Sequence, residues 1–172
     1  MKSKLYTFII LALIGCDRAP TVEKEEKTQD VIQAIPYHVD DPFTYDAFYF
    51  PLTVEDLMSQ YEQLKVTATP TTNIHEKSIT DTILKLSMGK TEFVIYRAKH
   101  RDLFQSAYIV TDDVVLKNNV RVGITKEDFG KKMGLNITDD KIQIGDTENN
   151  SYWVFTFKRD KLAIIEFDGY ID

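Results

Sequence analysis

The sequence predicts an α+β domain built from two tandem units, each a helix followed by antiparallel strands, with the helices packed on the sheet. Three observations support this prediction. One helix-start pattern occurs twice, around Thr53 and Thr125. Stretches of alternating apolar residues follow each helix start. Hydrophobic residues make up 43% of the 172 residues and aromatic residues 12%, which suffices for a core of ordinary size.

The two helix starts share the pattern apolar-Thr-x-Glu-Asp-apolar, at residues 52–57 and 124–129. In each, the threonine can cap the first turn, the aspartate three positions later completes a capping box, and the flanking apolar pair forms a hydrophobic staple. Gly134 is expected to end the second, shorter helix in a left-handed conformation. The first helix presents apolar side chains at helical spacing: Leu57, Tyr61 and Leu64.

Alternation of apolar residues predicts three strands after each helix. The expected strands are 82–88, 93–97 and 103–111 in the first unit, and 142–144, 152–157 and 162–167 in the second. Tight turns are expected at Gly89-Lys90 and Arg159-Asp160, and a longer loop at 66–79. The strand at 152–157 would place Trp153, Phe155 and Phe157 on one face.

The amino-terminal residues have the order of an export signal. Lys2 and Lys4 precede an apolar run, residues 5–14, that is too short to span a bilayer as a helix. Leu13-Ile14-Gly15-Cys16 follows, with a small residue before the only cysteine of the chain. This arrangement resembles a bacterial lipoprotein signal peptide. The predicted organisation is a signal peptide at 1–15, a flexible tether at 16–36 and a globular domain at 37–172, with units at about 37–113 and 114–172.

The resemblance implies that Cys16 carries lipid, a diacylglyceryl thioether together with an acylated amino group of the palmitate kind. Several acyl chains give stable membrane anchoring where one chain is marginal. The expected location is therefore the cell envelope, on the periplasmic face or the outer surface. Asp17 resembles an inner-membrane retention signal of enteric bacteria, while acidic residues at this place in other phyla resemble surface-export signals, so the choice of membrane stays open.

The charge balance disfavours nucleic acid as a partner. The chain has 21 basic and 27 acidic residues, and removal of the signal peptide takes away two lysines. Recognition of phosphate backbones depends on clustered lysine and arginine. The negative charge is expected mainly to keep a tethered domain soluble.

Residues 37–50 are rich in aromatic side chains, and two interpretations apply. An exposed patch that includes Tyr45 and Tyr49 would bind a partner or a glycan, since aromatic rings are enriched at interface cores. A strand or arm packed on the domain is favoured, because contiguous exposed apolar patches are rare on soluble proteins.

The second unit resembles the small outer-membrane lipoproteins of the SmpA/OmlA kind and the β-lactamase-inhibitor-protein-like fold that they share. The residues that carry the resemblance are Gly123-Ile124-Thr125, Met133-Gly134, Tyr152-Trp153-Val154-Phe155 and the returning strand at 162–165. The resemblance implies a protein that works by contact, either in an envelope assembly or as the inhibitor of a secreted enzyme. It also implies an open sheet face as the contact surface, with Tyr152, Trp153 and Phe155 as candidate binding residues.

The sequence contains no recognisable catalytic or cofactor motif. His38, His75 and His100 stand apart without the spacing of a zinc site, and nucleophile elbows and phosphate loops are lacking. A calcium loop at 146–149 would lack the central glycine of an EF-hand, so a solvated turn is favoured there. We therefore expect no enzyme activity, no cofactor and no metal. A protein-binding module is the first expectation, and a binder of a small ligand such as a glycan or lipid is the alternative.

Overall fold

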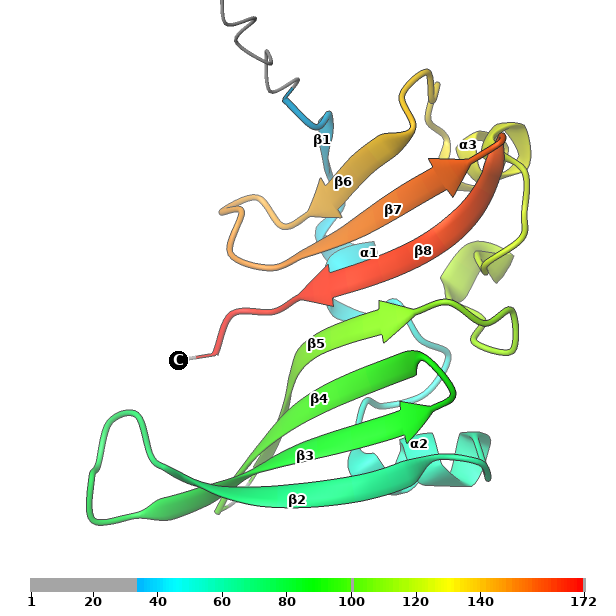
Figure 1. The fold of residues 1–172 in the computed structure, drawn as a ribbon. Coiled ribbons are helices and arrows are strands. Elements are labelled where there is room, and N and C mark those ends of the chain that lie inside the picture. Colours follow the sequence, from blue (N-terminus) through cyan, green and yellow to red (C-terminus); the bar gives the residue numbers. More distant parts are fainter. Residues whose placement is uncertain (1–33, 100, 172) are drawn as a thin grey trace, which may run out of the picture. The chain divides into compact units, whose positions relative to one another are not determined.

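The computed structural model describes residues 34–99 and 101–171 of the chain. Within them, one eight-stranded mixed sheet carries three helices, which confirms the α+β prediction. Figure 1 shows the strands in the order β1-β6-β7-β8-β5-β4-β3-β2. The predicted signal peptide, the lipidation site Cys16 and most of the predicted tether lie outside the described residues.

Along the chain, a helix followed by antiparallel strands occurs twice. The first set is α2 (Val54–Gln60), β2 (Lys65–Thr72), β3 (Thr80–Met88), β4 (Thr91–Ala98) and β5 (Arg101–Ile109). The second set is α3 (Lys126–Met133), β6 (Lys141–Gly145), β7 (Tyr152–Lys158) and β8 (Lys161–Asp168), preceded by a short 3-10 turn, η1 (Lys117–Asn119). Antiparallel pairing of β5 with β8 joins the two sets into one sheet.

Both predicted helix starts are confirmed. The Asp56 N–H donates to Thr53 Oγ1 at 3.1 Å, and the Asp128 N–H donates to Thr125 Oγ1 at 3.0 Å. The Thr53 hydroxyl donates in turn to the Asp56 carboxylate at 2.6 Å. Gly134 ends α3 with a φ of 67°, as predicted. Local capping therefore sets where both helices begin and where α3 ends.

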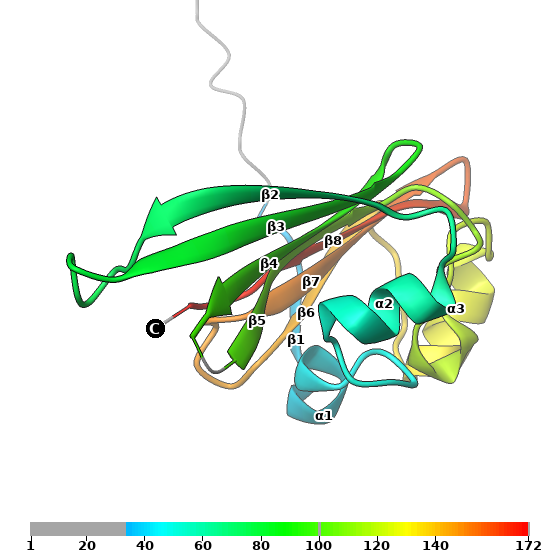
Figure 2. The same cartoon turned by 90° about the horizontal axis from the view of Figure 1, so that it is seen from below.

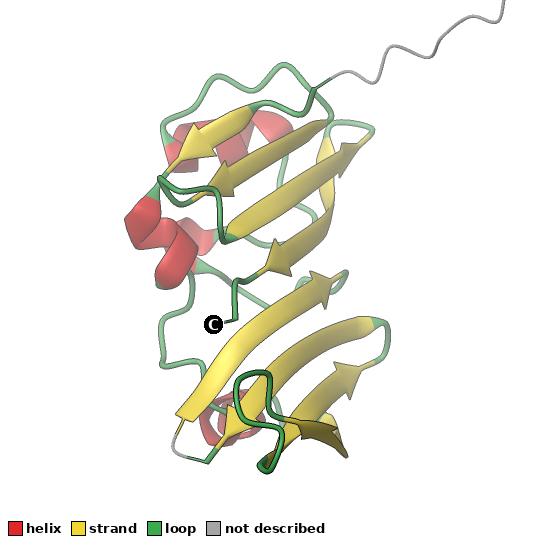
Figure 3. Cartoon of the chain, turned by 90° about the vertical axis from the view of Figure 1, so that its left-hand side faces the viewer, coloured by secondary structure: helices red, strands yellow, loops and turns green. Residues whose placement is uncertain are grey.

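The three helices cover one face of the sheet, and the other face carries none of the described helices (Figures 2 and 3). Side chains that alternate toward the helices form the core, and Trp153 is among the largest that are fully buried. Its ring stands 4.6 Å from that of Phe167 and 6.0 Å from that of Phe48, measured between centroids. The core therefore lies between the helices and the sheet, and it includes residues from both sets of strands.

The prediction of a loop at 66–79 is wrong for its first half, and residues 73–79 form a loop as expected. Residues Lys65–Thr72 form β2, an edge strand that pairs with β3 over eight residue pairs. None of its side chains is buried, so it has none of the apolar alternation on which the prediction relied. β-branched residues favour a strand, and Pro70 is tolerated because it lies on an edge.

The aromatic segment 37–50 packs on the domain, as favoured. It forms β1 (Tyr37–Val39), which runs parallel to β6, and the five-residue helix α1 (Asp41–Tyr45). Phe43 and Phe48 are buried, and the Trp153 indole N–H donates to the Thr44 carbonyl at 3.1 Å. The segment therefore contributes to the core beneath both sets of strands.

The two predicted hairpin turns are confirmed. Gly89 has a φ of 60° between β3 and β4, as a two-residue turn with glycine in first position requires. Arg159 and Asp160 connect β7 to β8 with φ values of 52° and 59°. These values are typical of a type I′ turn, in which asparagine and glycine are the preferred residues.

Candidate functional site

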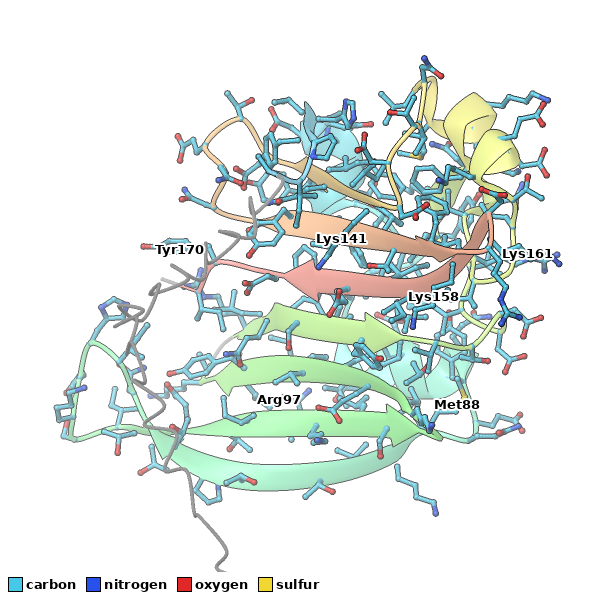
Figure 4. The ribbon with its side chains drawn as sticks, turned by 45° about the horizontal axis from the view of Figure 1, so that its top comes forward. Met88, Arg97, Lys141, Lys158, Lys161 and Tyr170 are labelled. Atoms are coloured by element: carbon cyan, nitrogen blue, oxygen red, sulfur yellow. The ribbon has the colours of Figure 1, made fainter. Side chains whose placement is uncertain are left out.

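The helix-free face, here called the open face, carries side chains from every second residue of each strand. Figure 4 shows these side chains above the ribbon. On the four central strands, β7, β8, β5 and β4, two neighbouring rows of cross-strand partners cross the face. One row is Val154, Glu166, Tyr108 and Glu92, and the other is Tyr152, Asp168, Ser106 and Val94. Pairing of β5 with β8 thus brings residues of both sets of strands onto one surface.

A hollow of about 360 Å³ lies over these two rows. All eight residues of the rows line it, together with Lys141 of β6 and parts of Ala107 and Phe167. Tyr152, Ser106 and Glu166 are half-buried, and Tyr108 is 40% exposed. The floor therefore combines apolar, hydroxyl and carboxylate groups that remain open to a partner.

Three carboxylates give the hollow an acidic lining. Glu92 is engaged by Lys85, whose Nζ lies 2.5 Å from the carboxylate. Asp168 accepts a hydrogen bond of 3.0 Å from the Tyr152 hydroxyl, and this bond raises the pKa of Tyr152. Glu166, two residues before Asp168 on β8, has no hydrogen bond or ion pair with another described residue.

Lys141 is the cation that lines the hollow. It comes from β6, and Figure 4 shows its side chain over the neighbouring strand β7. It forms no ion pair with a described residue, although three carboxylates share the surface. The lining therefore stays negative on balance.

Of the predicted candidate residues, Tyr152 alone lies on the open face. Trp153 and Phe155 are 1% and 0% exposed and pack beneath the helices, so their prediction as contact residues is wrong. The physical reason is the alternation of a strand, which sends residue 152 to one face and residues 153 and 155 to the other. Both aromatic rings belong to the core, where their apolar area stabilises the fold.

Tyr45 and Tyr49 are exposed, at 65% and 61%, but they do not join Tyr152. They belong to α1 and the bend after it, on the face that carries the helices (Figure 2). The Tyr45 hydroxyl donates to the Asp146 carboxylate at 2.8 Å, and the Tyr49 oxygen accepts from the Asn119 N–H at 3.4 Å. Their hydroxyls thus make contacts within the domain.

Residues 147–149 form an exposed turn, as favoured, but Asp146 before them is only 2% exposed. Asp146 Oδ1 accepts from the N–H groups of Glu148 and Asn150 at 3.0 and 2.9 Å. Oδ2 accepts from the Ser151 N–H and the Tyr45 hydroxyl, each at 2.8 Å. Burial acts to raise the pKa of Asp146, but these bonds outweigh it and hold the pKa below its usual value. The carboxylate therefore organises the loop.

Sequence reasoning missed Tyr108, Glu92, Glu166 and Asp168. The signal for Glu166 was present, because the alternation in 162–167 already placed it on the other face of the strand from the core residue Ile165. The pairing of β8 with β5 was not readable, since the two strands are distant in the chain. The acidic hollow arises from that pairing.

A second, larger hollow, about 890 Å³, lies beside α3 and the β7–β8 turn. Two of its lysines are already engaged: Lys126 Nζ stands 2.6 Å from Asp140, and Lys131 Nζ stands 2.6 Å from Glu127. Most of its lining side chains are exposed, whereas those of the open-face hollow are mostly half-buried or buried. We therefore place the candidate site on the open face.

Residues 34–99 and 101–171 contain neither a metal-binding cluster nor a membrane-spanning helix. No group of three histidine, cysteine, aspartate or glutamate side chains is arranged there to hold a metal ion. None of the helices there combines the length and the apolar character needed to cross a bilayer.

Comparison with known proteins identifies no relative: no protein-family model, no curated protein and no solved structure matches the chain.

Proposed function

We propose that this chain is a lipid-anchored protein of the cell envelope whose domain binds another protein, without catalysing a reaction. The contact surface is the open face of the sheet. The observation that carries this proposal is the half-buried hollow of tyrosines, small residues and carboxylates at the centre of that face. Interface cores are typically enriched in tyrosine and closely surrounded by polar groups.

The order of elements supports the proposed family. The resemblance to the β-lactamase-inhibitor-protein-like fold implies two helix-and-strand units joined in one sheet with an open face. The joining of the two strand sets through β5 and β8 agrees with that arrangement. We assign the domain to this fold family as part of the proposal, and inhibition of a secreted enzyme is one form that such binding takes.

Site-specific photocrosslinking in the native envelope tests the protein-binding proposal. A photoreactive phenylalanine derivative replaces Tyr108, which is 40% exposed on the open face, in the full chain. The matched control is Met58, which is 44% exposed on α2. A reproducible adduct with one protein from position 108 and none from position 58 is expected. Absence of an adduct at 108, or the same adducts at both positions, refutes the proposal.

Lipid anchoring rests on the predicted processing site and is tested separately. Cys16→Ser is expected to move the protein out of the membrane fraction, because the thiol that would accept the lipid is gone. Mass spectrometry of the wild-type amino terminus is expected to find a modified Cys16. An unmodified, uncut terminus, or unchanged fractionation of the variant, would contradict this part of the proposal.

The runner-up function is binding of a small ligand such as a glycan or lipid. The size of the hollow favours it, because small-molecule sites occupy about 300 to 1,000 Å³. Tyr108 and Tyr152 offer ring faces to a sugar. If no crosslinked protein is recovered while a soluble sugar or lipid raises the melting temperature, this alternative replaces the first proposal.

A further inference from the structure

We infer that the open-face hollow receives an arginine side chain of the partner protein. The inference rests on the proposed function and specifies the partner's chemistry at this site. Its basis is the combination of an unengaged carboxylate, aromatic rings and partial burial within one hollow.

Glu166 is the expected anchor. Its direct neighbours across the sheet are Val154 on β7 and Tyr108 on β5, so it has no counter-charge on either side. It is half-buried, and it makes no hydrogen bond or ion pair within the described part of the chain. A partly desolvated carboxylate is stabilised by a cation that donates hydrogen bonds to it.

Asp168 offers a second acceptor two residues along β8, on the same face. Such positions lie about 7 Å apart along a strand. The Tyr152 hydroxyl occupies Asp168 Oδ2 and leaves Oδ1 without a described donor. A guanidinium group carries five N–H donors in a planar fork, so it can bond Glu166 and still direct a donor toward Asp168.

Tyr108 favours arginine over lysine. Its ring is 40% exposed and stands beside Glu166 in the cross-strand row. A guanidinium plane stacks on an aromatic face while its edge bonds a carboxylate, whereas an ammonium group is compact and more strongly hydrated. Glu92 is paired with Lys85, so it does not compete with Glu166 for the same donor.

An anionic contact group is disfavoured by the same geometry. Three carboxylates line the hollow and one lysine, Lys141, faces them. A protein-borne arginine also suits the surroundings, because the open face continues over neighbouring strands on both sides of the hollow. Those strands offer area for a larger partner around a single inserted side chain.

The test uses the full chain in detergent and a short glycine-serine peptide with one central arginine. The same peptide with citrulline is the control, since citrulline keeps the shape and removes the charge. The arginine peptide is expected to shift the backbone amide signals of the hollow in NMR spectra, chiefly on β5 and β8. The citrulline peptide is expected to leave them unchanged.

Glu166→Gln is the decisive variant, because it keeps the size of the side chain on an open surface and removes its charge. We expect about a tenfold loss of affinity for the arginine peptide, equivalent to one charge-assisted contact. Glu62→Gln, the same change at an exposed position after α2, is expected to leave the affinity unchanged. Equal binding of the citrulline peptide, equal affinities of both variants, or shifts confined to other surfaces would overturn the inference.

Failure of the arginine inference can be distinguished from failure of the proposed function. One outcome is that position 108 gives an adduct with a protein in the envelope while Glu166→Gln changes neither the yield of that adduct nor the affinity for the arginine peptide. In that case the inference fails and the proposed function stands. If position 108 gives no adduct at all, the proposed function fails, whatever the peptide does. Unchanged melting of Glu166→Gln confirms that the variant is folded in either case.

Discussion

Replacement of Asp146 by asparagine tests whether one buried carboxylate organises the loop between β6 and β7. Asparagine retains one oxygen in the place of Oδ1, so the bonds from Glu148 and Asn150 persist. Its amide NH₂ then faces the Ser151 N–H and the Tyr45 hydroxyl, both of which donate to Oδ2 in the wild type. The hydroxyl can rotate and accept instead, but the backbone N–H of Ser151 cannot.

The expected cost follows from these two donors. A hydrogen bond to a charged group contributes about 1.5 to 3 kcal/mol, and an unsatisfied buried donor costs about 1 to 3 kcal/mol. We therefore expect Asp146→Asn to lower the free energy of unfolding by about 2 to 4 kcal/mol. Asp146→Ala removes all four acceptor contacts and is expected to cost more. These losses are large beside a typical domain stability of about 5 to 15 kcal/mol.

The stability that the Asp146 carboxylate contributes is expected to depend on pH in one direction. The pKa of Asp146 is lower in the folded protein than its ordinary value of 3.8. Its contribution is therefore fully present above pH 3.8 and is lost as the pH falls through the lower, folded pKa. Since asparagine does not titrate, the stability gap between wild type and variant narrows in acid. The hydrogen bond from the Tyr45 hydroxyl to the Asp146 carboxylate also raises the pKa of Tyr45, to about 12.

Urea unfolding of the full chain measures this gap, with the fluorescence of Trp153 as the signal. Trp153 is the only tryptophan and is buried in the core. Asp112→Asn, at an exposed position, is the control and is expected to change stability by less than about 0.5 kcal/mol. A variant as stable as wild type at neutral pH, or a gap that stays constant into acid, would refute the reasoning.

Three further predictions concern the sheet and its turns. Gly145→Ala is expected to lower stability by about 1 to 3 kcal/mol, because its Cβ would lie 2.3 Å from the Tyr37 hydroxyl oxygen; thermal unfolding measures this. Arg97→Lys is expected to cost about 1 kcal/mol in the same assay, since lysine cannot replace the two 2.6 Å bonds of the guanidinium to Asp102. Asp160→Gly is expected to raise the melting temperature by a few degrees, because glycine adopts the φ of 59° without a side-chain penalty.

Local features of the fold were readable from the sequence. Thr53 and Thr125 marked helix starts because a capping threonine acts on an N–H only three residues away. Gly89 and the alternation in β7 were readable for the same reason, since turns and strand faces depend on neighbouring residues. These signals predicted the α+β class and the two successive sets of helix and strands.

Contacts between distant parts of the chain were not readable. β2 was missed because an exposed edge strand needs no apolar alternation, and the parallel pairing of β1 with β6 has no local mark. The burial of Asp146 was not predicted: three of its four donors lie within five residues, but the fourth, the Tyr45 hydroxyl, lies 101 residues away.

The sequence by itself determined the secondary structure near each cap and turn, and the face to which each residue of β7 points. The tertiary structure alone decided that Glu166 lies between Val154 and Tyr108, and so where the candidate site is. The physical reason is that the free energy of a cap or turn comes from a few adjacent residues. The partner of a strand is chosen by packing of the whole core, which no short segment encodes.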